Sequence, residues 1–69
     1  MDFEKIDTVF ADSIETGDII EDEGEFFLIH HINDEGEMIE FSVESLSNID
    51  GDETILAYPY VSFGLYRSY

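Results

Sequence analysis

The sequence predicts one small, mostly β domain that spans residues 1–69 and contains a strongly twisted antiparallel sheet of five to six short strands. Two observations predict this fold class. Apolar runs of strand length alternate with turns that are rich in Gly, Asn and Asp. Hydrophobic residues make up 43% of the chain, with nine isoleucines and six phenylalanines, so it has the bulky, strand-favouring side chains that a disordered acidic segment lacks.

The turns divide the chain into its expected elements. Turns are expected at residues 16–18, 22–24, 33–36 and 48–52. Strands are expected at residues 8–11, 18–22, 25–32, 37–43, 54–58 and 61–66. The segment 3–10 is also compatible with a short N-terminal helix, because Phe3, Ile6 and Phe10 lie on one side of a helical repeat. Residues 43–49 are compatible with one further helical turn.

The segment 37–44 has the clearest strand pattern, because its apolar and polar residues alternate strictly. The apolar face consists of Ile39, Phe41 and Val43, and the polar face consists of Glu40, Ser42 and Glu44. The preceding run, 25–32, is apolar on both faces until its two histidines, which is typical of a central strand. We expect residues 33–36 to close a hairpin between the two, with Gly36 supplying a positive φ angle.

The charge of the chain is strongly unbalanced. Eighteen Asp and Glu residues oppose two basic residues, Lys5 and Arg67, which gives a net charge of −16. All eighteen carboxylates lie in an acidic body, 1–53, whereas all four tyrosines lie in a nearly uncharged aromatic region, 54–69. A surface of this sign repels nucleic acid and anionic lipid and attracts cations. We therefore expect the partner to be a basic protein surface, and neither a nucleic acid nor a membrane.

Several classes of chemistry have no signature in the sequence. There is no cysteine, so we expect no disulfide and no thiolate ligand or nucleophile. We find no Gly-x-Ser-x-Gly motif, no glycine-rich phosphate loop and no Ser/His/Asp signature. The prediction is a protein that is not an enzyme, with no catalytic residue and no cofactor. The sequence has no apolar run of membrane-spanning length and no signal-peptide pattern, so a cytoplasmic location is expected.

Three stretches between residues 11 and 43 form a pattern of turns and strands. They read Ala-Asp-Ser-Ile-Glu-Thr-Gly-Asp-Ile-Ile, then Glu-Gly-Glu-Phe-Phe-Leu-Ile, then Gly-Glu-Met-Ile-Glu-Phe-Ser-Val. These turns and the long hairpin resemble the small SH3-like barrels, among them the N-terminal domain of translation elongation factor P and many short bacteriophage proteins. The resemblance covers about half of the chain and implies a barrel fold, and a host cytoplasm for a phage-encoded protein.

The same resemblance argues against the activity of elongation factor P. That family carries a basic surface for RNA and a modified lysine or arginine at a hairpin tip. The matching tip here runs from Asn33 to Gly36 and contains no basic residue. The resemblance therefore implies the fold without the function.

Two groups of residues could bind a metal ion, and each also has an ordinary structural explanation. His30 and His31 are neighbours on an expected strand, so they face opposite sides and cannot reach one ligand together. We expect one histidine beside the core and the other in solvent. The acidic turns 48–53 and 21–25 offer oxygen ligands, but their spacing is not that of an EF-hand. We expect both turns to be solvated, with no metal site.

Two functions are compatible with this charge distribution. The first is an acidic protein-binding module that occupies a basic surface of its partner, and its most specific form is a phage-type DNA mimic that inhibits a nucleic-acid-binding host protein. Its expected binding residues are Glu21, Asp22, Glu23, Glu25, Asp34, Glu35, Glu37 and Glu40. The alternative is a structural or assembly protein that forms a homo-oligomer or docks through the aromatic region. Its expected interface residues are Tyr58, Tyr60, Phe63, Tyr66 and Tyr69.

Overall fold

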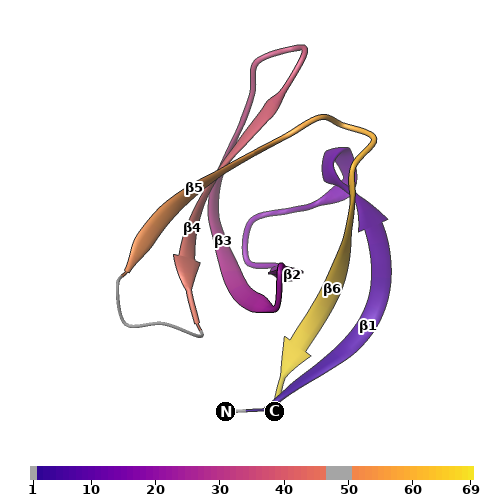
Figure 1. Cartoon of the computed structure of the whole chain (residues 1–69), viewed down its shortest axis with the longest axis vertical. Coiled ribbons are helices and arrows are strands. Elements are labelled where there is room, and N and C mark those ends of the chain that lie inside the picture. The colour runs from indigo at the N-terminus through magenta and orange to yellow at the C-terminus, as the bar shows by residue number, and fades with distance from the viewer. Residues whose placement is uncertain (1, 47–50) are drawn as a thin grey trace.

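The fold is mostly β, as the computed structural model of residues 2–46 and 51–69 shows (Figure 1). Six antiparallel strands form one sheet in the order β1-β6-β2-β3-β4-β5. They are β1 (Phe3–Phe10), β2 (Ile19–Asp22), β3 (Glu25–Asp34), β4 (Ile39–Ser45), β5 (Asp52–Ala57) and β6 (Ser62–Ser68). The predicted fold class, a mostly β domain with antiparallel strands in a single sheet, is confirmed.

The C-terminal strand is the element that joins the two parts of the sheet. β6 lies between β1 and β2, while β2, β3, β4 and β5 follow one another as a meander. Figure 1 shows β1 and β6 on one side of the molecule and β4 and β5 on the other. The sheet is therefore strongly curled. The molecule measures 35 × 26 × 19 Å. This curl allows one sheet to enclose a core by itself.

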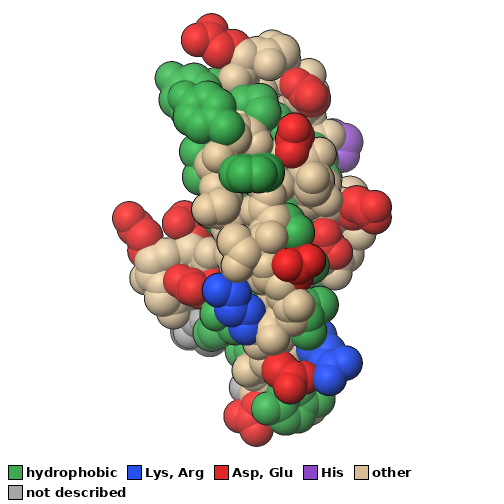
Figure 2. All heavy atoms as spheres, turned by 90° about the vertical axis from the view of Figure 1, so that its right-hand side faces the viewer, with side chains coloured by type: hydrophobic (Ala, Val, Ile, Leu, Met, Phe, Trp, Pro, Cys, Tyr) green, Lys and Arg blue, Asp and Glu red, His purple; other side chains and the backbone are tan. Residues whose placement is uncertain are grey.

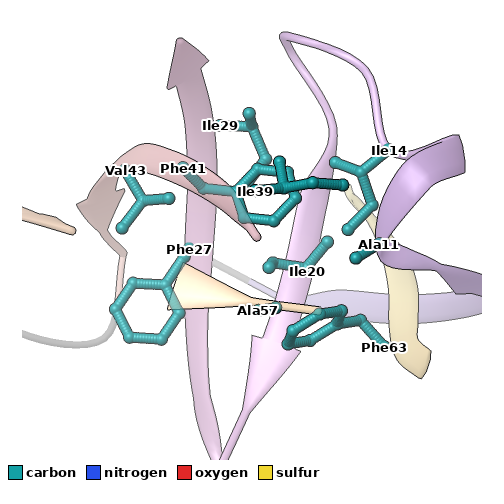
Figure 3. Packing of buried hydrophobic residues seen from close by; sticks show 10 residues of the cluster. All are labelled: Ala11, Ile14, Ile20, Phe27, Ile29, Ile39, Phe41, Val43, Ala57 and Phe63. Atoms are coloured by element: carbon teal, nitrogen blue, oxygen red, sulfur yellow. The ribbon is translucent and has the colours of Figure 1, made fainter. Parts of the chain in front are cut away.

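The core is a single cluster of ten buried hydrophobic side chains from the strands and the segment that follows β1 (Figure 3). They are Ala11, Ile14, Ile20, Phe27, Ile29, Ile39, Phe41, Val43, Ala57 and Phe63. Phe41 is fully buried at 0% exposure, and its ring meets that of Phe63 edge-on with centroids 6.5 Å apart. Contacts between strands that are distant in sequence therefore hold the sheet curled around this cluster.

Strand β4 has the alternation that its sequence predicts. Its three apolar residues, Ile39, Phe41 and Val43, are all buried in the core. The three polar residues between them, Glu40, Ser42 and Glu44, are only partly buried on the outer face. The register of this strand is thus the expected one.

Strand β3 is central, as its apolar character on both faces predicts, and it contains a bulge. It pairs with β2 on one side and β4 on the other. The register with β4 shifts between Ile29 and His31, which leaves His30 as the extra residue. Because of this bulge both histidines are exposed, so the expectation that one of them lies beside the core is wrong. Gly36 has a φ angle of 91°, as expected for the turn that follows β3.

The short N-terminal helix expected over residues 3–10 is wrong, because these residues form strand β1. The supposed helical stripe does not face the core, since Ile6 and Phe10 are 51% and 56% exposed. Instead, the backbone of β1 pairs with β6, from Phe3 opposite Ser68 to Phe10 opposite Ser62. A ladder to a strand at the far end of the sequence overrides a weak local helical pattern. The helical element that does occur here is a short 3-10 turn, η1 (Ala11–Ser13).

Part of one expected turn and of one expected helical turn lies outside the described residues. The helical turn expected over 43–49 is wrong for residues 43–45, which continue strand β4. Residues 47–49 of that helical turn, and residues 48–50 of the turn expected at 48–52, are outside the described residues. Within the described part of the chain, no helix is long and apolar enough to cross a membrane.

Candidate functional site

The eight candidate carboxylates lie in two separate clusters at the two ends of strand β3. The β2–β3 acidic cluster consists of Glu21, Asp22, Glu23 and Glu25. The β3–β4 acidic cluster consists of Asp34, Glu35, Glu37 and Glu40. Strand β3 is ten residues long, so the clusters are separated by up to about 30 Å. In Figure 1 the turn between β2 and β3 and the tip of the β3–β4 hairpin accordingly lie at different levels of the molecule.

The β2–β3 acidic cluster is built by a tight turn that brings four carboxylates into one hairpin end. Glu23 and Gly24 both have positive φ angles, 53° and 83°. The side-chain Oε2 of Glu21 accepts a hydrogen bond of 3.0 Å from the N–H of Gly24, which fixes the turn. Partial burial raises the pKa of Asp22, and repulsion from Glu23, Glu21 and Glu25 raises it further. The cluster is therefore a place where a positive charge would be stabilised.

The β3–β4 acidic cluster has carboxylates that also shape its turn. Asp34 Oδ1 accepts a hydrogen bond of 2.9 Å from the N–H of Gly36. Glu35 Oε1 accepts one of 3.0 Å from the side-chain amide of Asn33. Glu37 is exposed and follows them directly. Two of these carboxylates thus serve the local structure, while all of them add to the negative potential of the hairpin tip.

The two basic side chains lie outside both clusters, although Lys5 reaches over Gly64, the residue that pairs with Glu21 in the ladder between β6 and β2. Lys5 belongs to β1 and Arg67 to β6, and Figure 2 shows both side chains in blue. Arg67 is already engaged, because its Nη2 lies 2.6 Å from Glu4 Oε1. Among residues 2–46 and 51–69, the other such contact joins His30 and Glu44. In this described part of the chain, neither contact involves any of the eight candidate carboxylates.

The five candidate residues of the aromatic region are divided between the core and the surface. Phe63 is a core residue, so it is not available as an interface residue. Tyr66 is half-buried on the outer face of the sheet, where its ring meets that of Phe26 edge-on at 4.9 Å, and Phe26 stacks on Phe3. The remaining three, Tyr58, Tyr60 and Tyr69, are exposed. The rings of Tyr58 and Tyr60 stack on each other with centroids 5.4 Å apart.

The two histidines considered as metal ligands have different side-chain and ladder partners. Within the described residues, no group of three or more His, Asp or Glu side chains is arranged to hold a metal ion. His30 contacts Glu44, with Nε2 and Oε1 2.9 Å apart, and His31 pairs in the ladder with Ser42. Residues 48–50 of the acidic turn 48–53 lie outside the described residues.

An open groove beside the edge strand β5 is a feature that the sequence reasoning missed. It is lined by His30, Ser42, Val43, Asp52, Glu53 and Thr54. The sequence does indicate which face of β5 points outward. The residues Asp52, Thr54 and Leu56 alternate with the more apolar face that contains Ile55 and Ala57. The bulge in β3, which places His30 beside this face, could not be predicted from the sequence.

Compared with known proteins, the chain matches no family model, and neither a curated protein nor a solved structure shows significant similarity to it. The relation to small SH3-like barrels and to bacteriophage proteins therefore stays a prediction from the sequence.

Proposed function

We propose that the protein is an acidic binding module that occupies a basic surface of another protein. One observation carries this proposal: within the described residues, eight carboxylates in two clusters have no cationic side chain paired with them. Uncompensated charge of one sign opposes folding through self-repulsion. A partner that supplies the missing positive charge removes this repulsion, which is a favourable contribution to binding.

The most specific form of the proposal is a mimic of duplex DNA. B-form DNA carries one negative charge per roughly 1.7 Å of its axis, so a 35 Å length carries about 20 charges. The protein carries a net charge of −16 on a longest dimension of 35 Å, which is a similar linear density. A basic groove that holds DNA phosphates would meet a comparable charge on this molecule. Its partner would then be a nucleic-acid-binding protein, in the cytoplasm of a host cell for a phage-encoded inhibitor.

A charge-reversal experiment tests this function. The test variant changes Glu21, Asp22, Glu35 and Glu37 to lysine, two from each cluster. A matched control variant changes four exposed carboxylates near the N-terminus to lysine and so carries the same net charge: Asp2, Asp7, Asp12 and Glu15. Both variants are checked for folding by circular dichroism and then used as bait in a bacterial lysate, with elution by a salt gradient.

The two variants give opposite expectations for a partner that the native protein captures. We expect the test variant to lose the partner, and the control variant to keep it with a lower salt concentration for elution. Added duplex DNA should compete with the native protein for the partner if the protein is a DNA mimic. Equal binding by the native protein and the folded test variant would contradict the proposal.

A second candidate function is assembly through the aromatic region, and the stacked pair Tyr58 and Tyr60 favours it. Tyr60 is 71% exposed although its ring is large and part apolar. Exposed tyrosines are enriched at interfaces between proteins. We expect Tyr60→Ala to weaken a homo-oligomer or a docked complex measured by light scattering, if this region is the working surface. Tyr66→Ala is not suitable for this test, because Tyr66 packs on Phe26 within the monomer.

A further inference from the structure

The two edge strands of the sheet differ in how well they are protected. Strand β1 is irregular, because its register with β6 shifts between Lys5 and Asp7. Bulges and lysines on an edge hinder pairing with another strand. Strand β5 has neither device: its six residues pair with β4 without a register shift, and it contains no lysine and no proline. In the described part of the chain, β4 is the one strand with which β5 pairs.

The free side of β5 offers main-chain hydrogen bonds in a regular row. In an antiparallel ladder, every second residue directs its N–H and C=O away from the neighbouring strand. Four of the six residues of β5 are exposed, including Asp52, Thr54 and Leu56 on the outward face. Leu56 is 56% exposed, so its aliphatic side chain is accessible on this face.

We propose that β5 binds an extended, cationic peptide segment as a seventh strand of the sheet. Main-chain hydrogen bonds to an exposed edge supply affinity in this mode of recognition, and alternate side chains supply specificity. The positive charge expected of this peptide segment rests on the function proposed above. The residues involved are different, because β5 belongs to neither acidic cluster.

The charge at one end of β5 selects a basic side chain. Asp52 lies directly opposite Glu44 in the ladder between β4 and β5, and two like charges in this position are destabilising. His30 contacts Glu44 from the other side, while Asp52 has no such contact among the described residues. A lysine or arginine on an added strand would sit beside Asp52 and within reach of Glu44. It would offset the repulsion between the two carboxylates.

The other end of β5 selects an apolar side chain. Leu56 lies four residues after Asp52, so the two share one face of the strand. Thr54 lies between them and lines the groove. The complementary segment therefore has a basic and an apolar residue four positions apart, with a small or β-branched residue between them. A second copy of this chain is a poor occupant, because it brings a further charge of −16.

A designed peptide tests this inference on the intact protein. The probe is a blocked seven-residue peptide with Lys at its second position, Leu at its sixth, and Thr or Val elsewhere. A control peptide of the same composition has Leu at its fifth position, which puts the two side chains on opposite faces. Two further probes carry N-methyl groups on alternate backbone amides. One peptide is methylated at the odd-numbered residues and the other at the even-numbered residues.

The readout is the change in the amide signals of the ¹⁵N-labelled protein during titration. We expect saturable changes centred on residues 52–57, and affinity about tenfold lower for the control peptide. One phase of N-methylation should abolish binding while the other leaves it nearly unchanged, because alternate amides face the protein. Changes centred on β1, changes spread over the two acidic clusters, or equal effects of the two methylation phases would overturn the inference.

Protein variants separate this inference from the function proposed above. We expect Asp52→Asn combined with Leu56→Thr to weaken the probe about tenfold or more. The control variant combines Asp7→Asn with Ile6→Thr on the other edge strand, β1, and should leave the affinity for the probe unchanged. It is a matched control because Ile6 is 51% exposed, which is comparable to Leu56. The four-lysine variant of the acidic clusters should still bind the probe at β5. If that variant loses its protein partner while the native protein never binds the probe, the edge inference alone fails.

Discussion

His30 Nε2 lies 2.9 Å from Glu44 Oε1, and this contact joins the bulge of β3 to the outer face of β4. About half of each side chain is exposed, at 49% and 45%. The contact exists because the bulge turns an extra residue out of the β3–β4 ladder. It also places the imidazole beside the carboxylate that faces Asp52 across the β4–β5 ladder.

We predict that His30→Gln changes the free energy of unfolding by less than about 1 kcal/mol at pH 7. Exposed pairs of this kind contribute about 0–1 kcal/mol, because water screens them and two side chains must be ordered. Urea titration followed by circular dichroism measures the difference. A loss of several kcal/mol would mean that the bulge itself depends on the imidazole.

We predict that Phe41→Ala unfolds the domain or leaves it barely stable, whereas Glu40→Ala has little effect. Phe41 has no exposed surface, and truncating a buried Phe costs about 3–5 kcal/mol. Domains of this size have little more than that to lose. Glu40 faces outward on the same strand and serves as the control. Thermal melts of both variants followed by circular dichroism make the comparison, and the reverse ranking would contradict the register of β4.

We predict that Asp22→Asn stabilises the protein at pH 7 and that the gain disappears in acid. Folding raises the pKa of Asp22 above its ordinary value of 3.8, so folding favours the protonated form. At neutral pH the ionised group therefore costs stability, and this cost falls as the pH drops through the raised pKa. Below about pH 3.8 the carboxyl is protonated in both states. The asparagine then gives no advantage.

Melting temperatures of the native protein and Asp22→Asn between pH 7 and pH 3 test this prediction. Glu37→Gln is a suitable control, because Glu37 is exposed and lies outside the β2–β3 acidic cluster. It removes one charge from the chain, as Asp22→Asn does. An equal gain from both substitutions would mean that total charge matters and that the crowding around Asp22 does not.

We predict that salt raises the melting temperature of the isolated protein. A net charge of −16 makes repulsion the dominant electrostatic effect, and screening limits its reach to about 8 Å at 0.15 M ionic strength. Divalent cations should stabilise more than sodium at equal ionic strength. Melts between low and moderate salt measure this effect. A melting temperature that falls with added salt would show that attractive pairs outweigh the repulsion.

The parts of the fold that could be predicted from the sequence are those with a local signature. The alternation from Ile39 to Val43 depends on neighbours two residues apart, and the turn at Gly36 depends on one positive φ angle. Strand β1 could not be recognised in this way, because its partner β6 lies at the other end of the chain and the pairing has no local trace.

The candidate site was predictable as a set of residues but not as an arrangement. The carboxylates are where the turns place them, yet their division into two clusters depends on the length and path of β3. The burial of Phe63 depends on its contact with Phe41, and the bulge at His30 depends on the ladder between β3 and β4. Such features arise from pairing between strands, which composition and spacing do not encode.

The position of β6 between β1 and β2 has a consequence for the nascent chain during translation. β1 reaches its neighbour in the sheet only after β6 has been synthesised, whereas β2 already has β3 beside it. At about 5–20 residues per second, the ribosome needs roughly 3 to 12 s to proceed from the end of β1 to the end of β6. During that time Phe3 and Val9 have no strand beside them. All of the carboxylates are made before β6, and we expect their mutual repulsion to keep unfinished chains on the same messenger RNA from associating.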